Sequence, residues 1–255
     1  MPLRRPNRVF SAILTLCLAA CGGSTADAPV EPNGQGQQAA PAARLGLFST
    51  LPIYWGEGAD IGAMLDGGGE PGWVRPALEK QATLVPLDTL EEDALAGLGQ
   101  VVLAQPRPLA PSENVAFDSW LRKGGHALIL ADPMLTQHSD FPLGDPRRPH
   151  DLVLISPLLK RWGLELRFDE EQPEGERTIA YGKGRVPVEL AGHFVVATGE
   201  AEADCTVGES GLVATCKIGD GRAVLVADAA MVDDHFDTPE RRAALDGLLA
   251  EALSN

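Results

Sequence analysis

Positive charge and long apolar runs are both scarce in this sequence, and each shortage excludes a class of protein. Only 21 of the 255 residues are Lys or Arg, against 36 Asp or Glu, which gives a formal net charge of −15. Nucleic acid and anionic lipid head groups repel a net anion, so neither is expected as a partner. The apolar run over residues 9–20 is too short to cross a bilayer as a helix.

Several motifs that carry enzyme or metal chemistry are also missing. There is no Walker A sequence and no Gly-x-Ser-x-Gly turn, which excludes the ATP-hydrolysing part of a transporter and the common serine-hydrolase elbow. The five His residues are scattered, without His-x-x-x-His spacing, and no Cys-x-x-Cys pair occurs. Asp233-Asp234-His235 is the densest local cluster and is read as solvated loop charge in preference to a metal site. We predict neither a metal nor a cofactor.

The N-terminal segment is typical of an exported bacterial protein. Three arginines among the first eight residues precede the apolar run 9–20. That run ends in Leu18-Ala19-Ala20-Cys21, which resembles a bacterial lipobox. The resemblance implies that residues 1–20 are a lipoprotein signal peptide and that Cys21 becomes the lipid-modified first residue of the mature chain. An ordinary secretory signal is the alternative.

Beyond Cys21 the composition predicts a tether followed by one domain. Residues 21–43 are mostly Gly, Ala, Pro, Gln and Ser, too poor in large apolar side chains to fold. Residues 44–255, roughly 210 in number, suit a single domain. The mature chain keeps 18 basic residues against 36 acidic ones, so attachment to a membrane is expected through acyl chains. Gly22 favours the outer membrane over the inner one, with the domain facing the periplasm.

The domain alternates short apolar runs with amphipathic ones, which is typical of an α/β layer fold with a mostly parallel sheet flanked by helices. The run His126–Ala131 is almost continuously apolar, as expected of a strand buried on both faces. Strands are predicted over 45–49, 83–87, 101–104, 126–131, 164–168 and 222–227, with an antiparallel region over 186–196, and helices over 74–81, 90–98, 112–123, 151–162 and 239–253.

Side chains that cap helices support three of these assignments. Thr89, with Glu92 three residues later, forms the pattern of a capping box at the start of the 90–98 helix. Ser112 and Thr238 stand where caps are expected for the helices that follow them. In the helix begun by Ser112, the spacing places Val115, Trp120 and Leu121 on one face.

The remaining cysteines predict a disulfide in an antiparallel hairpin. A two-residue turn at Ser210-Gly211 places Cys205 directly opposite Cys216. Opposed Cα atoms of neighbouring strands lie about 4.5–5.5 Å apart, within the range of a disulfide. A metal pair or two free thiols are the alternatives, but no further His or Cys lies close by in the sequence, and an oxidising compartment favours the disulfide.

Polar residues follow three of the strands predicted to be buried. Gln105, Asp132 and Asp228 each stand directly after an apolar run. The carboxyl ends of parallel strands border the crevice in which open sheets bind ligands, so these side chains could contribute to a binding site. Caps of the turns that follow them are the simpler alternative. Tyr54 and Trp55, in the loop after the first strand, could add apolar contact area or pack in the core.

One part of the sequence resembles a known family. It comprises residues 101–133, with Pro-Ser-Glu, Lys-Gly-Gly and a strand ending in Asp132-Pro133, and the later Gly-Asp-Gly-Arg strand that ends in Asp228. This pattern is similar to the uncharacterised ABC-transport-associated domain of GldG-like gliding-motility components, which has a class I glutamine-amidotransferase-like, or flavodoxin-like, fold. Amidotransferase activity needs a cysteine after a central strand. Here Ala131 is followed by Asp132, so the resemblance implies the fold without the activity.

These observations lead to two expectations of function. The first is a noncatalytic, membrane-anchored binding or scaffold lipoprotein, associated with an ABC-type permease or a gliding-like envelope system, whose binding residues are Tyr54, Trp55, Gln105, Asp132 and Asp228. The alternative is an envelope hydrolase that uses Asp132 and Asp228, with or without His235 and a metal.

Overall fold

The computed structural model describes residues 43–57, 72–199 and 201–254. The predicted signal peptide, Cys21 and all but the last residue of the predicted tether lie outside these residues. Within the described ranges, no helix is both long enough and apolar enough to cross a membrane.

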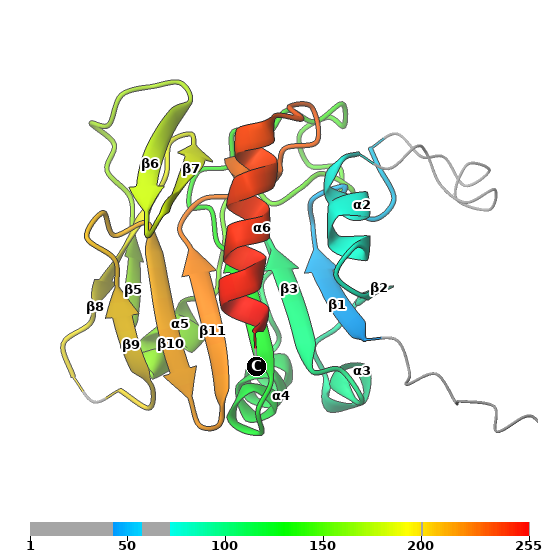
Figure 1. Cartoon of the computed structure of the whole chain (residues 1–255), viewed down its shortest axis with the longest axis vertical. Coiled ribbons are helices and arrows are strands. Elements are labelled where there is room, and N and C mark those ends of the chain that lie inside the picture. The colour runs from blue at the N-terminus through cyan, green and yellow to red at the C-terminus, as the bar shows by residue number, and fades with distance from the viewer. Residues whose placement is uncertain (1–42, 58–71, 200, 255) are drawn as a thin grey trace, which may run out of the picture. The chain divides into compact units, whose positions relative to one another are not determined.

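A seven-stranded, mostly parallel sheet forms the centre of the fold, as predicted (Figure 1). The strand order is β2-β1-β3-β4-β11-β10-β9. The first five strands are mutually parallel, and β10 runs antiparallel to both of its neighbours, β11 and β9. The strands are β1 (Arg44–Ser49), β2 (Thr83–Pro86), β3 (Gln100–Ala104), β4 (His126–Leu130), β9 (Asp204–Val207), β10 (Val213–Ile218) and β11 (Gly221–Val226).

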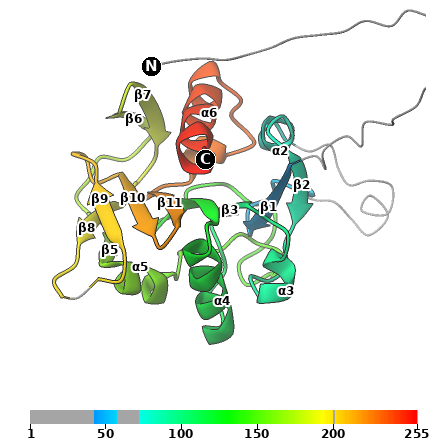
Figure 2. The same cartoon turned by 60° about the horizontal axis from the view of Figure 1, so that its bottom comes forward.

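Helices cover both faces of this sheet, so the fold has three layers (Figure 2). On one face lie α2 (Val74–Glu79) and α6 (Pro239–Leu253), and on the other lie α3 (Glu92–Leu95), α4 (Pro111–Arg122) and α5 (Ser156–Trp162). Two small antiparallel sheets, β5 (Leu164–Arg167) with β8 (His193–Val196) and β6 (Arg177–Tyr181) with β7 (Gly184–Val188), complete the domain together with the short 3₁₀ helix η1 (Ala230–Val232).

The core lies where the central strands meet both helical layers. Leu128 and Ile129 of β4 and Val224 and Leu225 of β11 are completely buried. Their side chains alternate between the two faces of the sheet, so both faces must be covered to exclude water. This is why β4 and β11 have almost continuously apolar sequences.

The helix predicted over 90–98 is much shorter than expected. Only Glu92–Leu95 is helical, and its N-cap residue, Glu91, has no side-chain cap. The capping box predicted for Thr89 and Glu92 is wrong, because the Thr89 hydroxyl donates to Glu113 of α4 instead. A partner distant in sequence has replaced the local one.

Two other helix starts also differ from the prediction. Helix α4 begins at Pro111, with Ala110 as its N-cap, and Ser112 Oγ donates to Glu91 Oε1 at 2.6 Å rather than capping its own helix. Its Val115 is 65% exposed, whereas Leu121 is buried, so these two residues do not share a face. Helix α5 begins at Ser156 instead of residue 151, because residues 151–155 are not helical and Val153 N–H donates to Asp132 O at 3.1 Å. The Thr238 cap is confirmed: its side chain accepts from Arg241 N–H.

The predicted disulfide hairpin is confirmed. Cys205 of β9 pairs directly with Cys216 of β10, with their Cα atoms 4.1 Å apart, and the two sulfurs are bonded. The connecting loop is longer than the two-residue turn predicted, because the last ladder bond runs from Gly208 N–H to Val213 O. The pairing register is unchanged by this extension.

Candidate functional site

The carboxyl ends of the parallel strands bring together the polar residues predicted to converge there. Gln105 follows β3 with a φ of 46°, a left-handed backbone that is uncommon for a residue other than glycine. Its side-chain amide donates to Asp132 O at 3.0 Å and accepts from Asp132 N–H at 2.9 Å. The Thr50 hydroxyl, after β1, donates to Gln105 O. The ends of three neighbouring strands, β1, β3 and β4, are therefore linked through one residue, by its side-chain amide and its backbone carbonyl.

The two aspartates of this edge, Asp132 and Asp228, are completely buried, and their carboxylate oxygens accept hydrogen bonds from backbone N–H groups. Asp132 accepts from Met134 N–H at 2.8 Å and from Ala229 N–H at 3.1 Å. Asp228 accepts from Ala230 N–H at 2.7 Å and from Glu189 N–H at 3.0 Å. Each carboxylate thus holds the turn after its own strand and a second segment, as expected of caps.

Burial changes the acidity of both carboxyl groups. Loss of hydration raises the pKa of Asp132 to about 6, against the opposing effect of its two backbone donors. The pKa of Asp228 is raised well above its ordinary value, first by burial and then by the negative charge of Asp132. The pair lies beneath the surface of the carboxyl edge, and neither aspartate is exposed to solvent in this structure.

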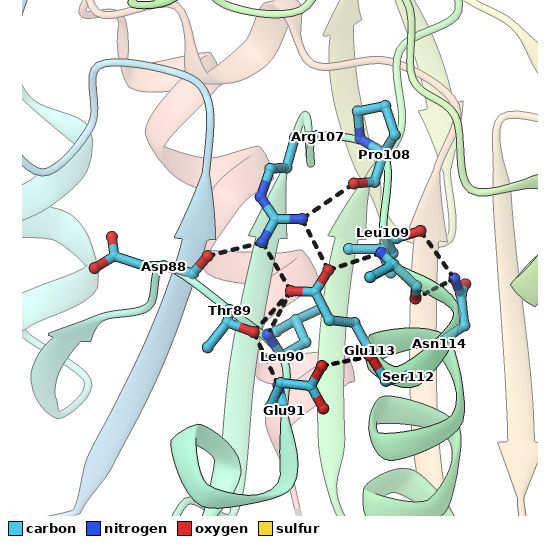
Figure 3. Close-up of polar contacts among 11 residues, drawn as sticks. Asp88, Thr89, Leu90, Glu91, Arg107, Pro108, Leu109, Ser112, Glu113 and Asn114 are labelled. Carbon is cyan, nitrogen blue, oxygen red and sulfur yellow. Dashed lines mark hydrogen bonds and ion pairs between the residues drawn. The ribbon is translucent and has the colours of Figure 1, made fainter.

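A second polar network joins the loops after β2 and β3 (Figure 3). The buried carboxylate of Glu113 accepts from Thr89 Oγ1 at 2.8 Å, from Leu90 N–H at 3.1 Å and from Ala110 N–H at 2.8 Å. Arg107 binds both oxygens of the same carboxylate, at 2.8 and 2.7 Å. We call these contacts around Glu113 the Arg107 clamp. It was not predicted from the sequence, although an acidic residue in the first turn of a helix is the signal that could have indicated it.

Arg107 extends the clamp to the neighbouring strand. Its guanidinium also donates to Asp88 O and Pro108 O, at 2.8 and 3.0 Å, and lies 4.9 Å from the centre of the Phe48 ring. The hydrogen bonds from Arg107 are the largest cause that lowers the pKa of Glu113 to about 2. The loop containing Asp88 is therefore fixed in place beside the carboxyl end of β1.

The aromatic loop after β1 forms one wall of a cavity of about 480 Å³, which we call the aromatic cavity. Tyr54 and Trp55 lie edge to face with ring centres 4.7 Å apart, and Trp55 is 44% exposed. Asp88, Phe141 and several prolines complete the lining, which consists of Leu47, Ser49, Thr50, Leu51, Pro52, Tyr54, Trp55, Gly56, Glu57, Pro86, Leu87, Asp88, Phe141, Pro146, Arg147 and Pro149. Of the five predicted binding residues, Tyr54 and Trp55 line this cavity, whereas Gln105, Asp132 and Asp228 are buried.

Two arginines hold aromatic rings of this cavity in position. The Arg75 guanidinium lies 4.3 Å from the Tyr54 ring centre, and that of Arg147 lies 4.1 Å from the Phe141 ring centre. Each arginine also pairs with a nearby carboxylate: Arg75 with Glu79 at 2.8 Å, and Arg147 with Asp145 at 2.7 Å. Trp73, beyond the same loop, is buried, and its indole N–H donates to Asp233 O at 3.1 Å.

The acidic cluster near His235 is held by contacts within itself and by donors from the start of α2, and its Asp233 is buried rather than solvated as predicted. His235 Nδ1 lies 2.9 Å from Asp233 Oδ1, and the pKa of His235 is raised mainly by this hydrogen bond. Among the described residues, no group of three or more His, Cys, Asp or Glu side chains is arranged to hold a metal ion.

A larger cavity, of about 810 Å³, lies between α3 and α4, away from the strand ends. Its lining is mainly apolar and includes Leu95, Leu98, Val115 and Trp120, with Glu92 and Lys123 at the rim. We place the candidate site in the smaller aromatic cavity because it combines exposed aromatic rings and carboxylates with the carboxyl edge of the sheet.

Comparisons with known proteins establish the fold only. No family model and no curated protein matches the sequence. Among solved structures, the mmIFT52 N-terminal domain is similar with a TM-score of 0.53 and 13% identity, over 84% of this chain and 98% of that one. Gan42B, a GH42 β-galactosidase from G. stearothermophilus, has a TM-score of 0.49 and 12% identity, over 83% of this chain and only 30% of the enzyme. A thua-like protein from Bacteroides uniformis has a TM-score of 0.41 and 12% identity, over 86% of this chain and 94% of that one.

Proposed function

We propose that this protein is a noncatalytic binding or scaffold lipoprotein of the cell envelope, anchored through Cys21 and associated with an ABC-type permease or a gliding-like system. The observation that carries the binding role is the aromatic cavity, where Tyr54 and Trp55 meet the carboxyl edge of a parallel sheet. Exposed aromatic rings beside a few fixed polar groups are the usual composition of a binding site.

The fold is compatible with the GldG-like and class I glutamine-amidotransferase-like assignment. The order β2-β1-β3-β4-β11 of the parallel strands agrees with a flavodoxin-like arrangement. In such sheets the crevice lies where the order reverses, here between β1 and β3, and the loops of the aromatic cavity follow β1 and β2. The outer membrane, favoured by Gly22, is part of the same proposal.

The chemistry of the carboxyl edge favours a noncatalytic role over the hydrolase alternative. A general acid or base must come within hydrogen-bond distance of the reacting group. Asp132 and Asp228 are fully buried, and their oxygens already accept backbone hydrogen bonds. Cys205 and Cys216 are bonded to each other, which leaves neither as a thiol nucleophile.

Crosslinking in cells tests the binding role. Trp55→Ala removes an exposed ring, so the variant is expected to fold normally, as checked by circular dichroism, yet to lose its crosslinked partners. Val115→Ala is the matched control, because Val115 is 65% exposed and lines the other cavity. A full partner set in the Trp55 variant and a reduced one in the Val115 variant would show that the site is wrongly placed.

A further inference from the structure

We infer that the aromatic cavity binds a neutral, hydroxyl-rich ligand with an apolar face, namely a saccharide. This inference rests on the proposed binding role and names the class of ligand. It follows from three properties of the cavity: the charges around it, the hydrogen-bonding groups it offers, and the rigidity of its rings.

The charged groups around the cavity repel an anion and cover the aromatic ring faces that a cation would use. A cation would be attracted to the faces of aromatic rings, but guanidinium groups already lie over Tyr54 and Phe141, at 4.3 and 4.1 Å. An anion would meet the carboxylates of Glu57 and Asp88, which line the cavity, while the guanidinium of Arg147 in the same lining is already paired with Asp145 at 2.7 Å. An uncharged ligand that donates hydrogen bonds to these carboxylates avoids both conflicts.

The carboxylates of Asp88 and Glu57 offer hydrogen-bond acceptors to a ligand, whereas the donor side chains of Ser49, Thr50 and Arg147 in the same lining already donate within the protein. The Asp88 carboxylate points away from the Arg107 clamp (Figure 3), and no donor to it is present among the described residues. Glu57 uses one oxygen, Oε1, to accept from Ser139 Oγ and Asp140 N–H, and within the part of the chain that the structure describes no donor contacts its Oε2. The prolines of the lining have no N–H to donate. A ligand with several hydroxyl donors satisfies these acceptors.

The aromatic rings provide a surface prepared for an apolar ligand face. Tyr54 is held by the cation–π contact of Arg75 and by the hydrogen bond from Arg75 to its carbonyl, at 2.9 Å. Trp55 packs against the Tyr54 edge, and its ring remains 44% exposed. A sugar ring has C–H groups on one face and hydroxyls around its rim, so it can cover Trp55 while donating to the carboxylates.

A proline-rich peptide is the other neutral ligand that uses aromatic grooves. Its backbone offers carbonyl acceptors and no donors at proline, so it would leave the Asp88 carboxylate without a partner. Desolvating a carboxylate without a compensating hydrogen bond is unfavourable. The acceptor-rich lining therefore favours the saccharide.

Calorimetric titration of the full-length protein with cellohexaose, maltohexaose and N-acetylated chitohexaose tests this inference. We expect saturable binding of at least one of them, weakened at least tenfold by Trp55→Ala, which removes the apolar surface, and several-fold by Asp88→Ala, which removes an acceptor. Val115→Ala, in the other cavity, leaves the affinity unchanged. Circular dichroism confirms that each variant is folded.

Two results would overturn the inference. One is the absence of saturable binding to all three saccharides, and the other is binding of decaproline in their place. If the crosslinked partners still depend on Trp55 while no saccharide binds, the ligand class is wrong and the binding role stands. If neither the crosslinked partners nor saccharide binding depends on Trp55, the proposed site itself is wrong.

Discussion

Replacing Glu113 with Gln should destabilise the protein strongly, although this glutamate lies outside the proposed binding cavity. The side chain is 3% exposed and joins two loops through Thr89, Leu90, Arg107 and Ala110. Its pKa falls from an ordinary 4.5 to about 2 in the folded protein. At about 1.4 kcal/mol for each pKa unit, the charged form contributes about 3 kcal/mol to folding.

The sign of this contribution determines its pH dependence. Because the folded pKa lies below the unfolded one, the stabilisation is complete above pH 4.5 and is lost as the pH falls toward 2. At pH 7 we expect Glu113→Gln to lower Tm by about 6 to 12 °C, since 1 kcal/mol corresponds to about 2–4 °C in a domain of this size. The difference between the variant and the wild type should shrink progressively below pH 4.5.

Urea and thermal unfolding at several pH values measure both the loss of stability in the variant and the dependence of that loss on pH. Glu165→Gln is the matched control, because Glu165 pairs with Arg167 at 2.8 Å while both side chains are more than half exposed. An exposed pair of this kind contributes about 0 to 1 kcal/mol. The reasoning fails if the two variants lose equal stability at pH 7, or if the loss in the Glu113 variant does not depend on pH.

Three further predictions concern the anchor, the disulfide and the buried aspartate pair. Cys21→Ser should release the protein from membranes without unfolding it, and retention of the variant in the membrane fraction would contradict the lipobox. Cys205→Ala should lower Tm by a few degrees. Closing the hairpin loop contributes about 3 kcal/mol to stability, and the hydrogen bonds between β9 and β10 already hold part of that loop together. Two titratable thiols in the unreduced protein would exclude the disulfide. Because the folded pKa of Asp132 is raised to about 6, stability should fall as the pH rises from 3.8 toward 6. Asp132→Asn should flatten that slope in urea unfolding, and an unchanged slope would refute the assignment.

The parts of the fold that depend on sequence-local patterns were predictable. Continuous apolar runs identified β4 and β11, and the spacing of Cys205 and Cys216 identified their pairing. The extents of α3 and α5 were not predictable, because they depend on partners distant in sequence. Thr89 is satisfied by Glu113, 24 residues away, and that contact replaces the local cap on which the predicted helix relied.

The convergence of the polar strand-end residues was predictable from the sequence, but their burial was not. The polar residues after β3, β4 and β11 converge as parallel topology requires. Their burial depends on the segment around His150, whose carbonyl accepts from the Gln105 amide at 2.8 Å, and on the left-handed backbone of Gln105. No local pattern signals either feature, so the sequence could not distinguish an open crevice from a closed, hydrogen-bonded edge.

The position of β1 in the sheet also determines how the domain responds to mechanical force. The chain enters the domain at Arg44, and β1 pairs along its length with both β2 and β3. A pull transmitted from a membrane anchor would act along the β1 axis and load both ladders in shear, so that many hydrogen bonds share the load. Peeling an edge strand would break them one at a time. In the anchored protein that we propose, tension at the attachment point would therefore be shared by the two ladders of an interior strand.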